Sequence, residues 1–322
     1  MGNALVRVKD LQVQFDGQRK IQALSGVNFE VGAGEVLTLL GESGSGKSVT
    51  LRTLLRLHPE KTTRIKGEII IDGQNVLSLN DKALNQYRGH TTSMIFQEPG
   101  LAFDPVYTIG QQMTEALLTH EQLHTSTAQA RALDMLERVQ IPQARKRFDA
   151  YPHELSGGMR QRAMIALALI CKPKLLLADE PTTALDASVQ IQILLLLREL
   201  QKETGMSVIF VTHDIGAAVE VSDRIAVMYA GRIVEIGGVE DMVSNPRHPY
   251  TQGLLASTVR YENRGSPLVT ITGSPPDLAH LPKGCNFAPR CTRAQANCLT
   301  EQPNWSTSDS TEFQCWYPIK TS

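Results

Sequence analysis

The chain has 322 residues, enough for one large core or two smaller ones, so we expect one main domain with an appendage. Its 32 basic and 33 acidic residues nearly cancel, and no stretch carries the basic run typical of a nucleic-acid binder, so no nucleic-acid partner is expected. No uncharged apolar run approaches the roughly 18 residues that span a bilayer, and the N-terminus lacks the apolar core of a secretion signal. We therefore expect a cytoplasmic protein that reaches a membrane only through partners.

The strongest chemical signal lies at residues 34–57, GEVLTLLGESGSGKSVTLRTLLRL, which predicts a buried strand, a glycine-rich loop and a helix. The spacing G-x4-G-K-S in that setting is a P-loop, and a mere glycine-rich turn seldom has it. Backbone N–H groups and a lysine would hold phosphates, while a serine hydroxyl would bind Mg²⁺. The sequence thus predicts ATP or GTP binding, by the residues Gly41, Ser43, Gly44, Ser45, Gly46, Lys47, Ser48 and Val49.

Helical spacing dominates the region that follows the P-loop segment. The stretches IGQQMTEALLTH and TAQARALDMLERVQI indicate helices, and we expect a helical subdomain at about residues 98–165. At its end, LSGGMRQR places Ser156, Gly157 and Gly158 at the start of a long helix, where bare N–H groups and a hydroxyl face an anion. Since the P-loop already cradles phosphates, this helix start makes sense if it serves the nucleotide of another subunit.

Two later strands carry polar residues at their ends. KLLLADEP (174–181) ends in Asp179, placed to face a metal ion, and Glu180, placed to polarise an attacking water. SVIFVTHD (207–214) delivers His213 at the carboxyl end of a strand, where open α/β sheets bind ligands. Adjacent acids are usually a solvated strand end and a lone histidine is usually structural, but the P-loop favours the catalytic interpretation of both.

The series LSGGMRQR, LLLADEP and TTALD resembles the signature, Walker B and D-loop motifs of ABC-type ATPases. IFQEP (95–99) resembles their Q-loop, and Phe15 resembles the aromatic residue that stacks on adenine. The resemblance spans residues 5 to about 240. It implies an α/β fold, a P-loop ABC-type ATPase domain with a RecA-like core, a helical subdomain and an antiparallel β part.

The same resemblance implies roles for individual residues in ATP cleavage. Glu180 would be the general base, His213 the γ-phosphate sensor, and Gln97 a link to Mg²⁺ and the attacking water, beside Lys47, Ser48 and Asp179. In this family two cassettes dimerise head to tail around two nucleotides. Ser156, Gly157 and Gly158 would then serve the partner's site, and Asp186 would lie near the dimer seam.

The last part of the chain resembles the C-terminal extension of ATPases that power oligopeptide and dipeptide ABC importers, a group that includes nickel and glutathione systems. The resemblance lies in RHPYTQGLLAS (247–257) and ITGSPPDLAHLPKGCNFAPRCTRAQANC (271–298). We therefore expect a nucleotide-binding domain at 1–240 and an extension at 241–322.

Four of the five cysteines fall in this extension, at the spacing C-x5-C-x6-C-x16-C. Disulfides are disfavoured in a reducing cytoplasm, zinc cysteines usually come in close pairs, and the spacing is not that of ferredoxins, so spacing alone does not decide the metal. The family resemblance implies a 4Fe-4S cluster, with zinc as the alternative, acting as a structural staple or as a redox sensor. Its ligands would be Cys285, Cys291, Cys298 and Cys315, and Cys171 would be a small buried hydrophobic residue.

These expectations combine into an ATP-hydrolysing subunit of a membrane importer for di- or oligopeptides, whose dimer closure drives translocation. It would sit at the cytoplasmic face of the inner membrane, bound to two transmembrane permease subunits. A second ATPase, either a related paralogue or a second copy, and an extracytoplasmic substrate-binding protein would complete the system. The alternatives are an importer of nickel chelates or glutathione, a subunit that binds ATP without cleaving it, and a non-transport ABC ATPase of the DNA repair or translation type.

Overall fold

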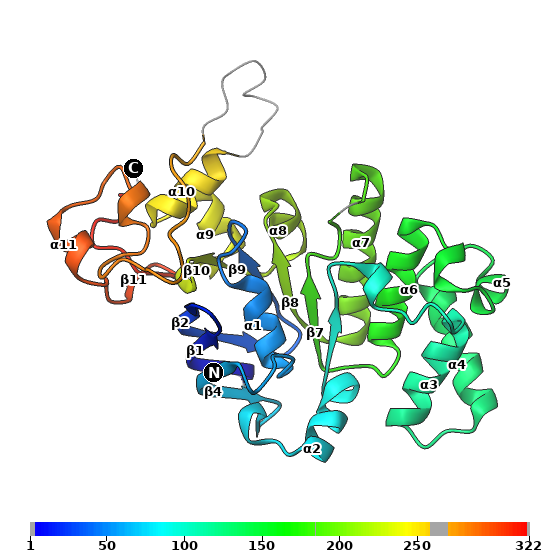
Figure 1. Cartoon of the computed structure of the whole chain (residues 1–322). Helices are drawn as coiled ribbons and strands as arrows, with labels where there is room; N and C mark the ends of the chain where they lie inside the picture. The colour runs from blue at the N-terminus through cyan, green and yellow to red at the C-terminus, as the bar shows by residue number, and fades with distance from the viewer. Residues whose placement is uncertain (1–3, 184, 258–269, 321–322) are drawn as a thin grey trace. The chain divides into compact units, whose positions relative to one another are not determined.

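The structure is a computed structural model that describes residues 4–183, 185–257 and 270–320 (Figure 1). The chain divides into two compact units, each considered by itself. The helical unit comprises Gly32–Glu35 and Ser78–Val211, and the P-loop unit comprises Ala4–Val31, Val36–Leu77 and the described residues from Thr212 onward. Within the described ranges no helix is long and apolar enough to cross a membrane.

An antiparallel sheet forms one part of the P-loop unit. Its strand order is β2-β1-β4-β5, with β1 at Ala4–Asp16, β2 at Lys20–Gly32, β4 at Thr63–Ile71 and β5 at Gln74–Asn75. Val6 and Val8 on β1 are buried and pair with Ile71 and Ile69 on β4, because alternate side chains of a strand share one face. The antiparallel β part expected from the sequence is confirmed.

A second group of strands in this unit carries the P-loop. β3 (Val36–Leu40) pairs in parallel with β9 (Arg224–Tyr229), and β9 pairs in antiparallel with β10 (Arg232–Gly238). The extension continues the order, since β12 (Thr311–Phe313) pairs with β10 and β11 (Ser306–Ser308) pairs with β12. The helices of the unit are α1 Lys47–Leu54, η1 Val76–Ser78, α8 Ile215–Val221, α9 Val239–Ser244, α10 Pro249–Ala256, η6 Ala288–Arg290 and α11 Ala296–Thr300.

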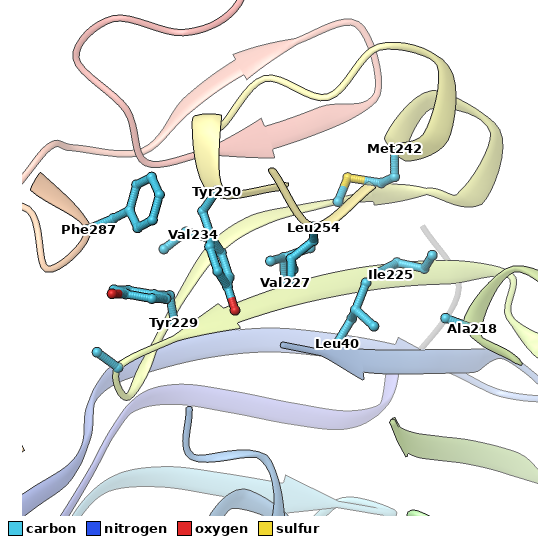
Figure 2. Close-up of a cluster of buried hydrophobic side chains, with 11 residues drawn as sticks. Leu40, Ala218, Ile225, Val227, Tyr229, Val234, Met242, Tyr250, Leu254 and Phe287 are labelled. Atoms are coloured by element: carbon cyan, nitrogen blue, oxygen red, sulfur yellow. The ribbon is translucent and has the colours of Figure 1, made fainter. Parts of the chain in front are cut away.

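A cluster of buried side chains joins the extension to the P-loop strand (Figure 2). Leu40 from β3 and Val227 from β9 share it with Tyr250 from α10 and with Phe287, which precedes η6. Tyr250 is 0% and Phe287 4% exposed. Burying a large apolar side chain contributes about 1.5–3 kcal/mol, so residues after 240 and the P-loop strand stabilise one common core.

The RHPY segment (247–250), which runs into the first turn of α10, is fixed by a buried carboxylate on β10. Glu235 accepts hydrogen bonds from the backbone N–H groups of Arg247, at 2.5 Å, and His248, at 2.9 Å. The His248 Nδ1 accepts the Tyr250 N–H at 3.0 Å, and burial lowers the His248 pKa to about 3, so the ring is neutral. The Arg247 guanidinium pairs with Asp309 at 2.9 Å. This segment therefore holds α10 against the sheet.

The helical unit contains three parallel strands, β6 (Thr92–Ile95), β7 (Leu175–Asp179) and β8 (Ser207–Thr212), in the order β6-β7-β8. β7 and β8 are buried along their whole length, as continuous apolar strands predict. The strands and helices expected in this region are confirmed. Its helices are α2 Asp81–Gln86, η2 Tyr87–Thr91, η3 Pro99–Leu101, α3 Ile109–His120, α4 Thr125–Arg138, α5 Ala144–Phe148, η4 Pro152–Glu154, α6 Gly157–Leu169 and α7 Ala187–Thr204.

Candidate functional site

Two glycines of the P-loop occupy positions that admit no side chain. A Cβ at Gly41 would lie 2.2 Å from the Met228 carbonyl oxygen. Gly46, which precedes α1, has a φ of 106°, and a Cβ there would lie 2.7 Å from Leu24 Cδ2. The loop can therefore lie close to β9 and turn into the helix only with glycine at both positions.

Lysine and serine side chains line the inside of this loop. Lys47 is 4% exposed, and its Nζ donates to the carbonyl oxygens of Gly41, at 2.7 Å, and Glu42, at 3.0 Å. The Ser45 hydroxyl is buried and makes no hydrogen bond to any residue that the structure describes. No acidic residue lies in the first turn of α1 and no side chain caps it, so its N–H groups suit an anion. The loop thus has the donors that a phosphate needs.

The other predicted nucleotide contacts of this unit come from α1, β1 and the residue after β8. Ser48 and Val49 are half-buried in the first turn of α1. Phe15, near the end of β1, is half-buried, and its ring packs against that of His58 at an interplanar angle of 72° and a centroid distance of 5.2 Å. His213 is exposed directly after β8. Their roles toward the nucleotide stay predictions.

In the helical unit the predicted general base and the Q-loop glutamine lie together. Glu180 Oε2 accepts hydrogen bonds from Gln97 Nε2 at 3.4 Å and from the Thr183 hydroxyl at 2.9 Å. Glu180 has a φ of 46°, a conformation that costs energy for any residue but glycine and is often found at functional sites. Its N–H donates to the Val211 carbonyl at 3.0 Å, which holds the strained backbone in place. Asp179, the last residue of β7, is 1% exposed.

The signature and D-loop residues form two neighbouring helix starts in the same unit. Ser156 caps α6 by accepting the Met159 N–H at 3.3 Å, and Ser156 and Gly157 are exposed. A Cβ at Gly158 would lie 3.3 Å from Val189 in the first turn of α7. Asp186 caps α7, and hydrogen bonds from the Ser188 hydroxyl and the Val189 N–H lower its pKa. The start of α6 is therefore exposed at Ser156 and Gly157, whereas the rest of the helix is mostly buried.

The four cysteines of the extension line one small cavity, together with Phe287, Pro303, Trp316 and Tyr317. All are free thiols. Burial raises the pKa of Cys285 and Cys291, and it raises that of Cys315 to about 12, with the neighbouring cysteines adding to these increases. As the side chains stand, no group of three or more His, Cys, Asp or Glu within the described ranges could hold a metal ion. The 4Fe-4S cluster and the zinc alternative are therefore not supported by the side-chain geometry.

Comparison with known proteins gives matches over nearly the whole chain. The family model of ABC transporters matches residues 24–183, and that of the oligopeptide/dipeptide transporter C-terminal region matches residues 234–298. The oligopeptide transport ATP-binding protein OppD of Bacillus subtilis (strain 168) is 46% identical over 97% of this chain and 88% of its own length. The dipeptide transport ATP-binding protein DppD of the same organism is 44% identical over 97% and 94%.

Solved structures agree with the sequence matches. The dimeric structure of an ATP-binding cassette in a post-hydrolysis state, bound to ADP and phosphate, superposes with a TM-score of 0.65 at 30% identity, covering 73% of this chain and 98% of that one. Fold and motifs together define an ABC-type ATPase, which confirms the predicted fold class. The chain belongs to the ABC transporter family, in the group of oligopeptide and dipeptide transport ATP-binding proteins.

The sequence did not predict the contacts between the extension and the P-loop. Arg290 donates a hydrogen bond to the Glu42 carboxylate, and the Tyr250 hydroxyl accepts one from the Glu42 N–H. No motif spacing reveals either contact. The only signals were an acid inside GESGSGKS and an arginine directly before Cys291. Their partners are more than two hundred positions apart in the chain, so the sequence pattern could not pair them.

Proposed function

We propose that this chain is the ATP-hydrolysing subunit of a membrane importer for di- and oligopeptides. The observation that carries the proposal is that its similarity to peptide-transport ATP-binding proteins covers the extension as well as the cassette. An ABC ATPase of the DNA repair or translation type has no reason to carry that extension. We also propose the division into residues 1–240 and 241–322, with the helical subdomain at about 98–165.

ATP would bind at the P-loop through its glycine N–H groups and Lys47. The hydroxyl of Ser48 and the amide oxygen of Gln97 are hard oxygen donors, which suit Mg²⁺. When bound, Mg²⁺ would neutralise phosphate charge. Glu180 would accept the proton of the attacking water, and Gln97, hydrogen-bonded to Glu180, would help to orient that water. His213 would contact the γ-phosphate, and Phe15 would stack on adenine.

A second cassette would complete the active unit. The signature residues Ser156 and Gly157, which are exposed, and Gly158, which is half-buried, would bind the partner's nucleotide, with Asp186 near the seam. The dimeric cassette structure at 30% identity supports such an assembly. The partner would be a related paralogue or a second copy, and closure of the pair on ATP would drive the transport step.

Two permease subunits would hold the chain at the cytoplasmic face of the inner membrane, with the helical subdomain as the docking element. An extracytoplasmic substrate-binding protein would deliver the peptide. The ATPase itself would not contact the transported molecule, so the permeases and the binding protein would select the substrate.

The proposed transport function predicts substrate-dependent ATP hydrolysis. The chain would be purified with its permeases, partner ATPase and binding protein, reconstituted into vesicles, and assayed for phosphate release. Dipeptides or longer peptides are expected to raise the rate. Stimulation only by glutathione or a nickel chelate would overturn the peptide assignment, and stimulation only by DNA or ribosomes would overturn transport.

We further propose that the four-cysteine cavity holds a 4Fe-4S cluster, with zinc as the alternative. Thiolates are ligands for both, and the aromatic residues around the cavity would exclude water. The side chains of Cys285, Cys291, Cys298 and Cys315 would have to rotate toward one another and lose their protons. A structural role in a short, loop-rich extension is favoured over redox sensing.

The cluster proposal predicts a metal content that depends on particular cysteines. Protein purified without oxygen should contain about four irons and matching sulfide per chain, with visible absorption. Cys298→Ser should lose the iron, whereas the matched control Cys171→Ser, at the one cysteine outside the extension, should retain it. Zinc in the wild-type protein would establish the alternative, and a metal-free protein would refute both.

A further inference from the structure

An ion pair joins the P-loop to the four-cysteine extension within the P-loop unit. Arg290 Nη1 donates to Glu42 Oε2 at 2.6 Å and Nη2 donates to Oε1 at 3.1 Å, which is the two-pronged geometry of a strong arginine–carboxylate pair. The Arg290 side chain is only 5% exposed and that of Glu42 29%. The carboxylate raises the Arg290 pKa. Glu42 is the second residue of the P-loop GESGSGKS.

Arg290 makes further contacts that fix the position of its guanidinium group. Its Nε donates to the Thr272 carbonyl at 3.0 Å, and its Nη2 donates to the Ile271 carbonyl at 3.2 Å. Its Nη1 also donates to the Tyr229 hydroxyl at 3.3 Å, and the guanidinium lies 5.8 Å from the centre of that ring. All three nitrogens of the guanidinium group therefore have partners, so its position is fixed before any nucleotide arrives.

A second contact from the extension reaches the backbone of the same residue. The Tyr250 hydroxyl accepts the Glu42 N–H at 2.9 Å. Tyr250 is fully buried, and its ring packs against Tyr229 and Phe287 at centroid distances of 4.6 and 5.3 Å (Figure 2). The extension thus fixes Glu42 through both its side chain and its backbone.

Glu42 is connected in turn to the groups that would bind phosphate. Its carbonyl oxygen accepts from Lys47 Nζ at 3.0 Å and from the Ser45 N–H at 3.2 Å. A shift of Glu42 would move both groups. The carboxylate also carries a negative charge close to the loop that receives phosphates, and only a paired cation cancels its repulsion of ATP.

We propose that Arg290 and Tyr250 are positioning residues for ATP binding: they hold Glu42, and through it the P-loop, in the phosphate-binding conformation, and Arg290 cancels the Glu42 charge. The extension is then a part of the nucleotide site of its own chain. This inference deepens the proposed function and rests on ATP binding at Lys47. It requires no metal at the cysteines, because every contact is made by the chain itself.

The test compares Mg²⁺-ATP affinity, by calorimetry on the full chain, between Arg290→Met and a matched control. Arg131→Met removes another two-pronged arginine–carboxylate pair, that with Glu121 in the helical unit, whose side chains are 30% and 26% exposed. Arg290→Met is expected to weaken ATP binding by about tenfold, with the control within twofold of wild type. In the importer, the Michaelis constant for ATP should rise while turnover at saturating ATP stays the same.

A double-mutant cycle separates positioning from general stability. With Glu42→Gln as background no charge remains to cancel, so adding Arg290→Met should cost much less affinity than it costs in the wild-type chain. Tyr250→Phe, which keeps the ring and removes only the hydroxyl, should weaken ATP binding by about threefold. If Arg290→Met does not fold, the Tyr250→Phe variant still tests the proposal.

Two results would overturn the inference. One is equal ATP affinity in Arg290→Met, Tyr250→Phe and Arg131→Met, with only the melting temperatures changed. The other is an equal loss of affinity from Arg290→Met with and without Glu42→Gln. A separate control, Lys47→Ala, reports on the proposed ATP site alone: if it binds ATP normally, the proposed function fails for a reason unrelated to Arg290.

Discussion

Replacing Glu180 by Gln is expected to lower ATP turnover by about 10²- to 10⁴-fold while ATP binding persists, because the proposed general base loses its proton-accepting charge. The substitution keeps the size of the side chain. Its remaining oxygen can still accept a hydrogen bond from Thr183, so the local structure should survive. Bound ATP that is not cleaved should also hold the paired cassettes together. Phosphate release and the nucleotide retained after gel filtration measure these two effects.

The matched control for this experiment is Glu199→Gln, the same change at an exposed acid of α7. It should turn over ATP at the wild-type rate. Normal turnover in Glu180→Gln would exclude Glu180 as the base. Loss of ATP binding in the same variant would instead show that Glu180 acts in nucleotide affinity.

Replacing Gly41 by Ala is expected to weaken ATP binding by about 10- to 100-fold, because a displaced loop loses hydrogen bonds to a charged phosphate, each of which contributes about 1.5–3 kcal/mol. The new Cβ would lie 2.2 Å from the Met228 carbonyl oxygen, and that oxygen belongs to β9, which is paired on both edges. The strand cannot yield, so the loop must move. The Gly41 carbonyl oxygen would then lose the hydrogen bond that it accepts from Lys47 Nζ at 2.7 Å. Calorimetric titration with Mg²⁺-ATP measures the loss.

Gly73→Ala separates this effect from the general cost of losing a glycine. Gly73 also has a positive φ, of 75°, but a Cβ there meets nothing within 4 Å, and it lies in the turn between β4 and β5. Its alanine variant should lose about 1–2 kcal/mol of stability and keep the wild-type ATP affinity. Wild-type affinity in Gly41→Ala would show that the loop tolerates the displacement.

Local patterns were sufficient to predict most elements around the nucleotide site. The mostly apolar run at 36–40 became the buried strand β3, and the run at 175–179 became β7, because a strand buried on both faces consists mainly of apolar residues. Helical periodicity likewise predicted α3 and α4. The structure adds the boundaries of the predicted helix: α1 begins at Lys47, inside the P-loop motif, and ends at Leu54.

Sequence alone determined the candidate residues for the chemistry of this protein, since a P-loop, a strand-end carboxylate pair and a capped glycine-rich helix start each lie in contiguous residues. Only the tertiary structure decided which of them meet. Gln97 contacts Glu180, and Arg290 contacts Glu42 across 248 positions. Sheet pairing and a shared core bring these segments together, although nothing in the local sequence of one segment identifies the other. Long-range contacts depend on how strands and side chains pack, which short-range spacing does not encode.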